Sequence, residues 1–137
     1  MGVDIYGLRP KSEKGEYFRS NWWFWRPIWA FSVLLCEDIL EETTMECEDG
    51  TVIRYHEASV GLTNDGFIIR EEKAVEMGRR ILEVLKDEKR FKDVVKRVMS
   101  LFAERVDSDG KPMYHLSREA LREWAEFCID SGGFSIC

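Results

Sequence analysis

The sequence predicts an α+β domain in which about four helices pack on a small, mostly antiparallel sheet. Apolar residues recur at three- and four-residue steps in four long segments, as they do on the buried face of an amphipathic helix. Short apolar segments near both chain ends, and an Asp49-Gly50 dipeptide between two apolar runs, favour strands and a hairpin. No repeat or Pro/Ser-rich linker divides the chain, so residues 1–137 are expected to form a single globular domain.

The four expected helices cover residues 27–42, 71–86, 88–106 and 117–130. Pro27 suits the first turn of the first helix, because its fixed φ is helical and its missing N–H would have no partner there. The third segment is expected to be the longest amphipathic helix and to end at the turn residues Asp107–Gly110. Ser117 is a typical N-cap for the fourth helix, and Gly132-Gly133 would end it in a left-handed cap.

Short apolar strands are expected at both ends of the chain, at Val3–Ile5 and Phe134–Ile136. We expect these two strands to pair in one sheet, which would bring the chain ends together. Residues 45–57 are predicted to form a hairpin with a two-residue turn. The glycine-punctuated residues 61–66 are expected to form a loop.

Aromatic residues are concentrated ahead of and within the first expected helix. Eight of the 17 aromatic residues occupy 15 positions: Tyr17, Phe18, Trp22, Trp23, Phe24, Trp25, Trp29 and Phe31. Residues 16–26, ahead of the helix, are predicted to be extended, so Trp22, Phe24 and Arg26 would share one face of a strand. Trp23 and Trp25 would lie on the other face. Such a strand would be packed centrally between helices, or some rings would form a stacking wall or self-association surface beside Arg26.

Charge is unevenly distributed along a chain whose formal net charge is −6. Residues 37–49 carry seven acids and no basic residue, whereas residues 79–97 have a net charge of +4. The acidic segment is open to three interpretations: a solvated face, a docking surface for a basic partner, or a divalent-cation site. The basic stretch could dock on the acidic segment of the same chain or of a neighbour, or contact phosphate. The acidic total argues against nucleic acid as the main partner.

The four cysteines include no pair at the two- to four-residue spacing of a structural zinc site, so free thiols and no metal are expected. No cofactor motif is present. The first ten residues lack the basic start and apolar stretch of a secretory signal, and no apolar run reaches membrane-spanning length. We therefore expect a cytoplasmic protein without a membrane partner.

One polar constellation is a candidate ligand-binding site. His56 is expected at the end of a strand, with Asn64 and Asp65 in the following glycine loop, where functional residues are common. Trp25 and Arg26 would complete the edge of this pocket and favour a small-molecule ligand. No nucleophile-elbow, Walker or zinc-protease signature assigns catalytic residues, so whether the chain is an enzyme stays open.

Three sequence blocks carry a resemblance to a known family. They are the start MGVDIYG (1–7), the block GEYFR (15–19) followed by WRPIW (25–29), and the end SGGFSIC (131–137). Together they resemble a family of small uncharacterised proteins of bacteria and their phages. The resemblance implies a cytoplasmic, mobile-element setting, and it implies no catalytic residue.

The leading hypothesis for function is a noncatalytic protein-interaction or regulatory factor that engages another protein or a second copy of itself. A second hypothesis is a small-molecule-binding protein or small enzyme, with its pocket at the five residues named above. A third is a phage-related accessory protein that contacts nucleic acid through the 79–97 region.

Overall fold

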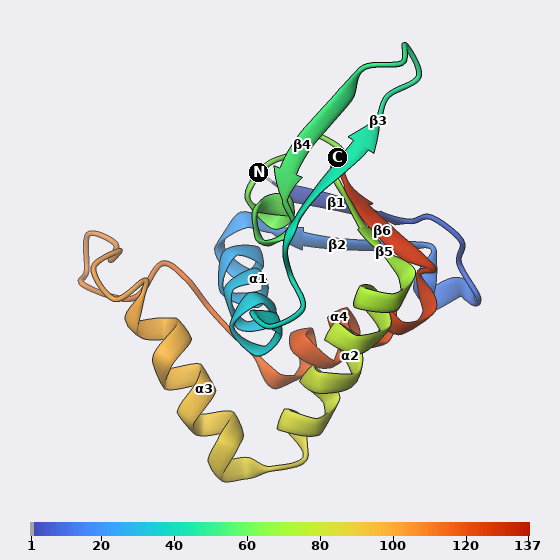
Figure 1. Cartoon of the computed structure of the whole chain (residues 1–137). Helices are drawn as coiled ribbons and strands as arrows, with labels where there is room; N and C mark the ends of the chain where they lie inside the picture. The colour runs from blue at the N-terminus through green and yellow to red at the C-terminus, as the bar shows by residue number, and fades with distance from the viewer. Residues whose placement is uncertain (1) are drawn as a thin grey trace.

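Figure 1 shows the computed structural model of the chain, which describes residues 2–137. Within these residues four α-helices accompany a four-stranded antiparallel sheet and a separate two-stranded hairpin, so the predicted α+β class is confirmed. The elements are β1 (Gly2–Gly7), η1 (Glu13–Gly15), β2 (Tyr17–Asn21), α1 (Trp22–Cys36), β3 (Glu42–Glu46), β4 (Val52–His56), η2 (Glu57–Leu62), β5 (Ile68–Arg70), α2 (Glu71–Leu85), α3 (Glu88–Ser100), α4 (Arg118–Asp130) and β6 (Gly133–Ile136).

The main sheet has the order β2-β1-β6-β5, and each neighbouring pair is antiparallel. Ile5 lies opposite Ile136, which confirms the predicted pairing of the two terminal strands. Helices α1, α2 and α4 pack against the sheet, whereas α3 packs against α1 and α2 at the edge of the molecule (Figure 1). In this strand order β6, the last strand of the chain, lies between β1 and β5 in the interior of the sheet.

The core is built around three tryptophans. Trp25 stacks on Trp29 with 5.8 Å between ring centroids, and Trp124 meets Trp25 edge-on at 4.9 Å. Each buried indole N–H has an acceptor: Trp25 donates to the Gly61 carbonyl, Trp29 to the Ala58 carbonyl and Trp124 to Ser32 Oγ, all at 2.8–2.9 Å. These rings therefore bury a large apolar area without leaving a donor unpaired.

Residues 22–26 are helical, so the prediction of an extended segment is wrong for these residues. Tyr17–Asn21 are extended as predicted, but they form β2 at the edge of the sheet rather than a central strand. Helix α1 begins at Trp22, where Asn21 Oδ1 accepts the Phe24 N–H as an N-cap, and Pro27 lies inside the helix. Proline has no N–H to donate to the carbonyl four residues earlier, that of Trp23. The backbone N–H of His115 donates to that carbonyl at 2.9 Å instead. A distant segment thus compensates for the proline, which no local pattern reveals.

Several element ends differ from the predicted ones. Helix α1 ends at Cys36 rather than near residue 42, and α3 ends at Ser100. At 13 residues α3 is shorter than α2, so it is not the longest amphipathic helix. The hairpin turn is longer than two residues, because Gly50 N donates to Cys47 O and Cys47 N to Thr51 O. The expected loop contains the end of η2, and β5, which was not predicted, follows it.

Local signals around the last helix are confirmed. Ser117 Oγ accepts the Ala120 N–H at the start of α4. Gly132 and Gly133 follow the helix with φ values of +70° and +91°, which residues with a Cβ adopt at a cost in strain. An added Cβ at Gly132 would also lie 2.3 Å from the Arg9 carbonyl oxygen. Glycine at this position therefore permits both the helix end and the close approach of the chain after β1.

Phe134→Ala should destabilise the fold by about 3–4 kcal/mol, because the ring is fully buried and packs against Trp29, Trp124 and Phe127. Urea unfolding followed by tryptophan fluorescence measures this change. Leu8→Ala is the control, because Leu8 is 45% exposed and should give a change below about 1 kcal/mol. Equal effects of the two substitutions would contradict this account of the core.

Candidate functional site

An open groove of about 700 Å³ lies between α1 and the C-terminal end of α3. The groove is bordered by η2, by residues 101–105 just after α3, and by Tyr114 in the segment ahead of α4. Its lining residues are Arg26, Trp29, Ala30, Val33, Leu34, Glu37, Ala58, Leu62, Arg97, Val98, Ser100, Leu101, Phe102, Arg105 and Tyr114. Most of this surface is apolar, and its polar groups are dominated by guanidinium groups.

The groove exists because α1 is apolar on more than one side. One side buries Trp25, Ile28 and Phe31 in the core. Another side carries Ala30, Val33 and Leu34, which remain only partly buried and line the groove. Helix α3 covers α1 incompletely, because only two of its residues, Val94 and Val98, are buried. A second apolar side of α1 therefore faces the groove rather than the core.

The chain turns away after α3 and leaves further apolar side chains at the groove. Leu101 is 72% exposed and Leu62 is 51% exposed, which is unusual for side chains of this size gathered in one place. Phe102 packs against Tyr114 with 4.7 Å between ring centroids, and Tyr114 in turn meets Trp23 edge-on at 5.1 Å. These aromatic contacts hold the segment after α3 beside the start of α1.

Three arginines carry the positive charge of the groove, against the single carboxylate of Glu37. Among the ion pairs within residues 2–137, none includes Arg26, Arg97 or Arg105. The Arg26 guanidinium lies 4.9 Å from the Trp22 ring centroid, and its Nη1 is 3.4 Å from the Tyr114 hydroxyl. Arg26 is thus held in position with most of its donors free for a ligand.

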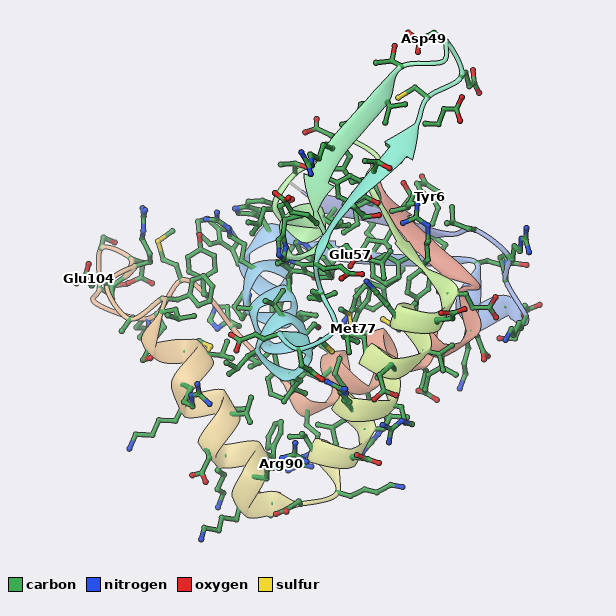
Figure 2. All side chains as sticks on the ribbon, in the orientation of Figure 1. Tyr6, Asp49, Glu57, Met77, Arg90 and Glu104 are labelled. Atoms are coloured by element: carbon green, nitrogen blue, oxygen red, sulfur yellow. The ribbon has the colours of Figure 1, made fainter. Side chains whose placement is uncertain are left out.

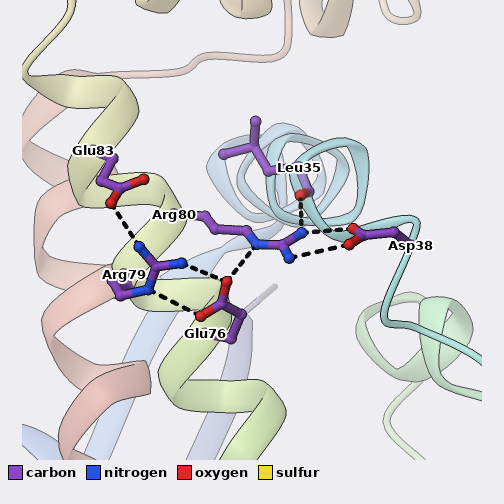
Figure 3. A network of polar contacts seen from close by, with 6 residues as sticks. All are labelled: Leu35, Asp38, Glu76, Arg79, Arg80 and Glu83. Carbon is purple, nitrogen blue, oxygen red and sulfur yellow. Dashed lines mark hydrogen bonds and ion pairs between the residues drawn. The ribbon is translucent and has the colours of Figure 1, made fainter.

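At the start of the acidic segment, residues 37–49, a basic side chain of α2 forms an ion pair with a carboxylate. Figure 3 shows Arg80 donating to the Leu35 carbonyl, to both carboxylate oxygens of Asp38 and to Glu76. Hydrogen bonds from Arg79 and Arg80 lower the pKa of Glu76 to about 2. The prediction that the basic stretch contacts the acidic segment of the same chain is confirmed at this point.

A second cation of α2 fixes the base of the hairpin. Glu57 is 1% exposed, and its Oε1 accepts from the Glu41 N–H and from Lys73 Nζ. Lys73 also donates to Glu41 at 3.2 Å. Burial of the Lys73 ammonium opposes its charge, but the bonds to the two carboxylates outweigh this and raise the pKa of Lys73. Arg70, the last residue of β5, also donates to the Thr44 carbonyl, so β5 and α2 together hold the hairpin to the rest of the molecule.

The tip of the hairpin retains its negative charge. Glu46, Glu48 and Asp49 form no ion pair with any of the residues that the structure describes, and Asp49 instead accepts the Thr51 N–H in the turn. Figure 1 shows the hairpin extending away from the helices, and Figure 2 places Asp49 at its outer end. Val52, at the start of β4, is 62% exposed. The tip therefore combines unpaired acids with exposed apolar surface.

The five residues predicted to bind a ligand divide between two places. Arg26 lines the groove. The other four lie around η2: Trp25 donates to Gly61, His56 Nδ1 accepts the Ala58 N–H, and Asn64 and Asp65 are exposed in the loop that follows. The groove does not include these four residues, and their role in binding stays a prediction.

Of the residues that line the groove, the sequence identified only Arg26 as a candidate binding residue. Arg105 lies beyond the basic stretch 79–97, and Leu101 falls within the longer helix expected over residues 88–106. The useful signal was in α1: a helix with apolar residues on nearly every side, in a chain of this size, needs more than one partner surface.

Among residues 2–137, no cluster of three or more His, Cys, Asp or Glu side chains is arranged to hold a metal ion. None of the helices in these residues has the combination of length and apolar character that crossing a bilayer requires. Comparison of the chain with protein-family models finds no matching model, and comparisons with curated proteins and with solved structures find no match. The family resemblance of the three sequence blocks therefore stays a prediction.

Glu76→Gln should lower the stability of the fold by about 1 kcal/mol at pH 7, since solvent partly screens the pairs with Arg79 and Arg80. The folded pKa of about 2 lies below the ordinary value of 4.5, so the charged carboxylate stabilises the fold above pH 4.5. This contribution is lost as the pH falls through the range between the two values. Urea unfolding of the unmodified chain and of Glu76→Gln at several pH values should show that their difference in unfolding free energy shrinks as the pH falls. A difference that does not depend on pH would contradict the stabilising role of the Glu76 carboxylate.

Lys73→Met should destabilise the fold by about 3 kcal/mol, because it leaves the buried Glu57 carboxylate without its cation. Lys86→Met is the matched control, since Lys86 is exposed and forms no ion pair with the described residues. Thermal unfolding measured by circular dichroism compares the two variants. A melting temperature unchanged by Lys73→Met would show that the pair does not anchor the hairpin.

Proposed function

We propose that this protein is a noncatalytic protein-interaction factor whose groove between α1 and α3 binds an acidic, amphipathic segment of a partner protein. The observation that carries the proposal is the combination of an apolar floor with three arginines that have no carboxylate partner. The apolar floor favours a ligand with an apolar face, and the arginines favour one whose edges are negatively charged.

The apolar part supplies the driving force for association. Covering a largely exposed side chain such as Leu101 stabilises a complex by about 1.5–2 kcal/mol. Leu62, Val33 and Leu34 offer further surface that a partner would remove from water. A protein segment with apolar side chains on one face fits such a groove better than a compact polar ligand does.

The arginines supply the specificity. A guanidinium group donates two parallel hydrogen bonds to a carboxylate, and it is more weakly hydrated than an ammonium group. Arg26 comes from α1, Arg97 from α3 and Arg105 from the segment after α3, so an acidic segment could pair with them while its apolar face covers the floor. Glu37 would repel additional acids on its side and so restrict the orientation of the partner.

The side-chain chemistry of the groove supports binding rather than catalysis. Its lining contains one carboxylate and neither histidine nor cysteine. Ser100 Oγ, the only serine hydroxyl among the lining residues, donates to the Arg97 carbonyl rather than to a base. These residues do not provide the paired acid and base that most hydrolytic or transfer reactions need.

The test uses a fluorescein-labelled helical peptide of about 16 residues, with Leu on one face and Glu elsewhere. Its binding to the full chain is measured by fluorescence anisotropy. We expect saturable binding that weakens as salt rises, because screening reduces the contribution of the arginines. Arg97→Glu/Arg105→Glu should weaken binding at least about tenfold, which corresponds to about 1.4 kcal/mol.

Two controls make this test specific. Lys89→Glu/Lys96→Glu makes the same change in net charge at α3 positions outside the groove, so it should alter the affinity less than about threefold. A peptide with Lys in place of Glu should bind at least about tenfold more weakly. Equal binding of the two peptides, or preferential displacement of the acidic peptide by a single-stranded oligonucleotide, would contradict the proposal.

A further inference from the structure

The acids of residues 37–49 fall into two groups with different surroundings. Near the body of the molecule, Asp38 pairs with Arg80 and Glu41 with Lys73. At the far end, Glu46, Glu48 and Asp49 pair with no basic side chain of the described residues. Glu42 pairs with Arg54 within the hairpin, and Glu37 lines the groove without an ion pair in the described residues. Pairing within the chain therefore offsets most of the negative charge near the base of the hairpin and leaves it at the tip.

The hairpin tip carries both apolar and acidic groups, as does the segment that the groove is proposed to bind. Val52 is 62% exposed next to the turn, and Ile53 is only partly covered. Glu46 lies opposite Val52 on the other strand and Glu48 lies in the turn, so the tip presents apolar and acidic groups together. An exposed valine flanked by acids matches an apolar floor flanked by arginines in both polarity and charge.

The tip of one chain does not reach its own groove. Figure 1 shows the hairpin extending from one end of the molecule, whereas α3 lies at the other end. Figure 2 shows Asp49 at the tip well apart from Glu104, which lies in the segment just after α3 that borders the groove. Contact between the two surfaces therefore requires two molecules.

We propose that the groove binds the tip of the β3–β4 hairpin, residues 46–52, of a second copy of this chain. This inference rests on the proposed function and names the partner. Arg97 and Arg105 of one copy would pair with Glu46 and Glu48 of the other, and Val52 would cover part of the apolar floor.

The base of the hairpin is suited to this role. Lys73 joins Glu41 and Glu57 to α2, and Arg70 binds the Thr44 carbonyl, so both strands are fixed where they leave the body. A hairpin held in this way loses little conformational entropy when its tip is bound. Since each copy offers one tip and one groove, association extends to further copies at high concentration unless two copies exchange tips reciprocally.

The experiment is sedimentation velocity of the full chain over a range of concentrations, at low and high salt, with a reducing agent present because Cys47 lies at the tip. We expect reversible association that weakens at least about tenfold between about 50 mM and 300 mM salt. Glu46→Lys/Glu48→Lys changes the tip and spares Asp49, whose carboxylate accepts a hydrogen bond within the turn. Arg97→Glu/Arg105→Glu changes the groove.

Each variant alone should sediment as a monomer at concentrations where the unmodified chain associates. An equimolar mixture of the two variants should associate again, because the reversed charges of one complement those of the other. Glu16→Lys/Glu123→Lys is the matched control for the tip variant, since it makes the same change in net charge as Glu46→Lys/Glu48→Lys. Its two positions are exposed and form no ion pair in the described part of the chain. This control should associate like the unmodified chain.

The outcomes separate this inference from the proposed function. A chain that stays monomeric while the acidic peptide binds its groove would overturn self-association and leave the proposed function standing. Association that persists in either variant would overturn the pairing of tip and groove. A monomeric chain that also fails to bind the peptide would overturn both.

Discussion

The structure depends on burying three indole rings without losing a hydrogen bond. Trp25 and Trp29 project from the same side of α1, and Trp124 comes from α4 at the far end of the sequence. Their N–H groups bind two carbonyls of η2 and the hydroxyl of Ser32, which itself donates to the Ile28 carbonyl. A single cluster therefore fixes α1, α4 and η2 relative to one another. The orientation of α1, and hence of its second apolar side, follows from this packing.

Helix α2 contributes to the fold through ion pairs as well as through packing. Its side chains at Lys73 and Arg80 hold the start of the acidic segment at two separate positions. Burying the Glu57 carboxylate is tolerated because an ammonium group and a backbone N–H both bind it. Without these contacts, the repulsion among neighbouring acids would oppose the hairpin conformation. The paired charges thus serve the fold, and those left unpaired are available to other molecules.

Two sets of charges without an ion pair lie at separate places on the molecule. Glu46, Glu48 and Asp49 lie at the hairpin tip, and three arginines line the apolar groove near the end of α3. Charge separation of this kind steers association and selects partners more than it adds affinity. The apolar groups beside each set of charges supply the remaining stabilisation on contact. The interaction role proposed for the protein follows from this arrangement rather than from any catalytic group.

The sequence alone determined the elements whose signals are local. The Ser117 cap, the glycines after α4, the α2 helix and the hairpin all depend on residues within a few positions of one another, so their patterns could be read directly. It also predicted the pairing of the terminal strands, from the two short apolar segments at the chain ends. The candidate site was only partly predictable: Arg26 was identified, but the convergence of Arg97 and Arg105 with it was not.

Only the tertiary structure decided the state of the aromatic segment and the shape of the groove. Trp22–Arg26 could form a strand or a helix by propensity, and the helix is compatible with Pro27 because His115, far along the chain, donates to the Trp23 carbonyl. After α3 ends at Ser100, Phe102 packs on Tyr114, whereas Leu101 stays exposed. In both cases the deciding contacts join residues distant in sequence, and their energies exceed the small differences in local propensity.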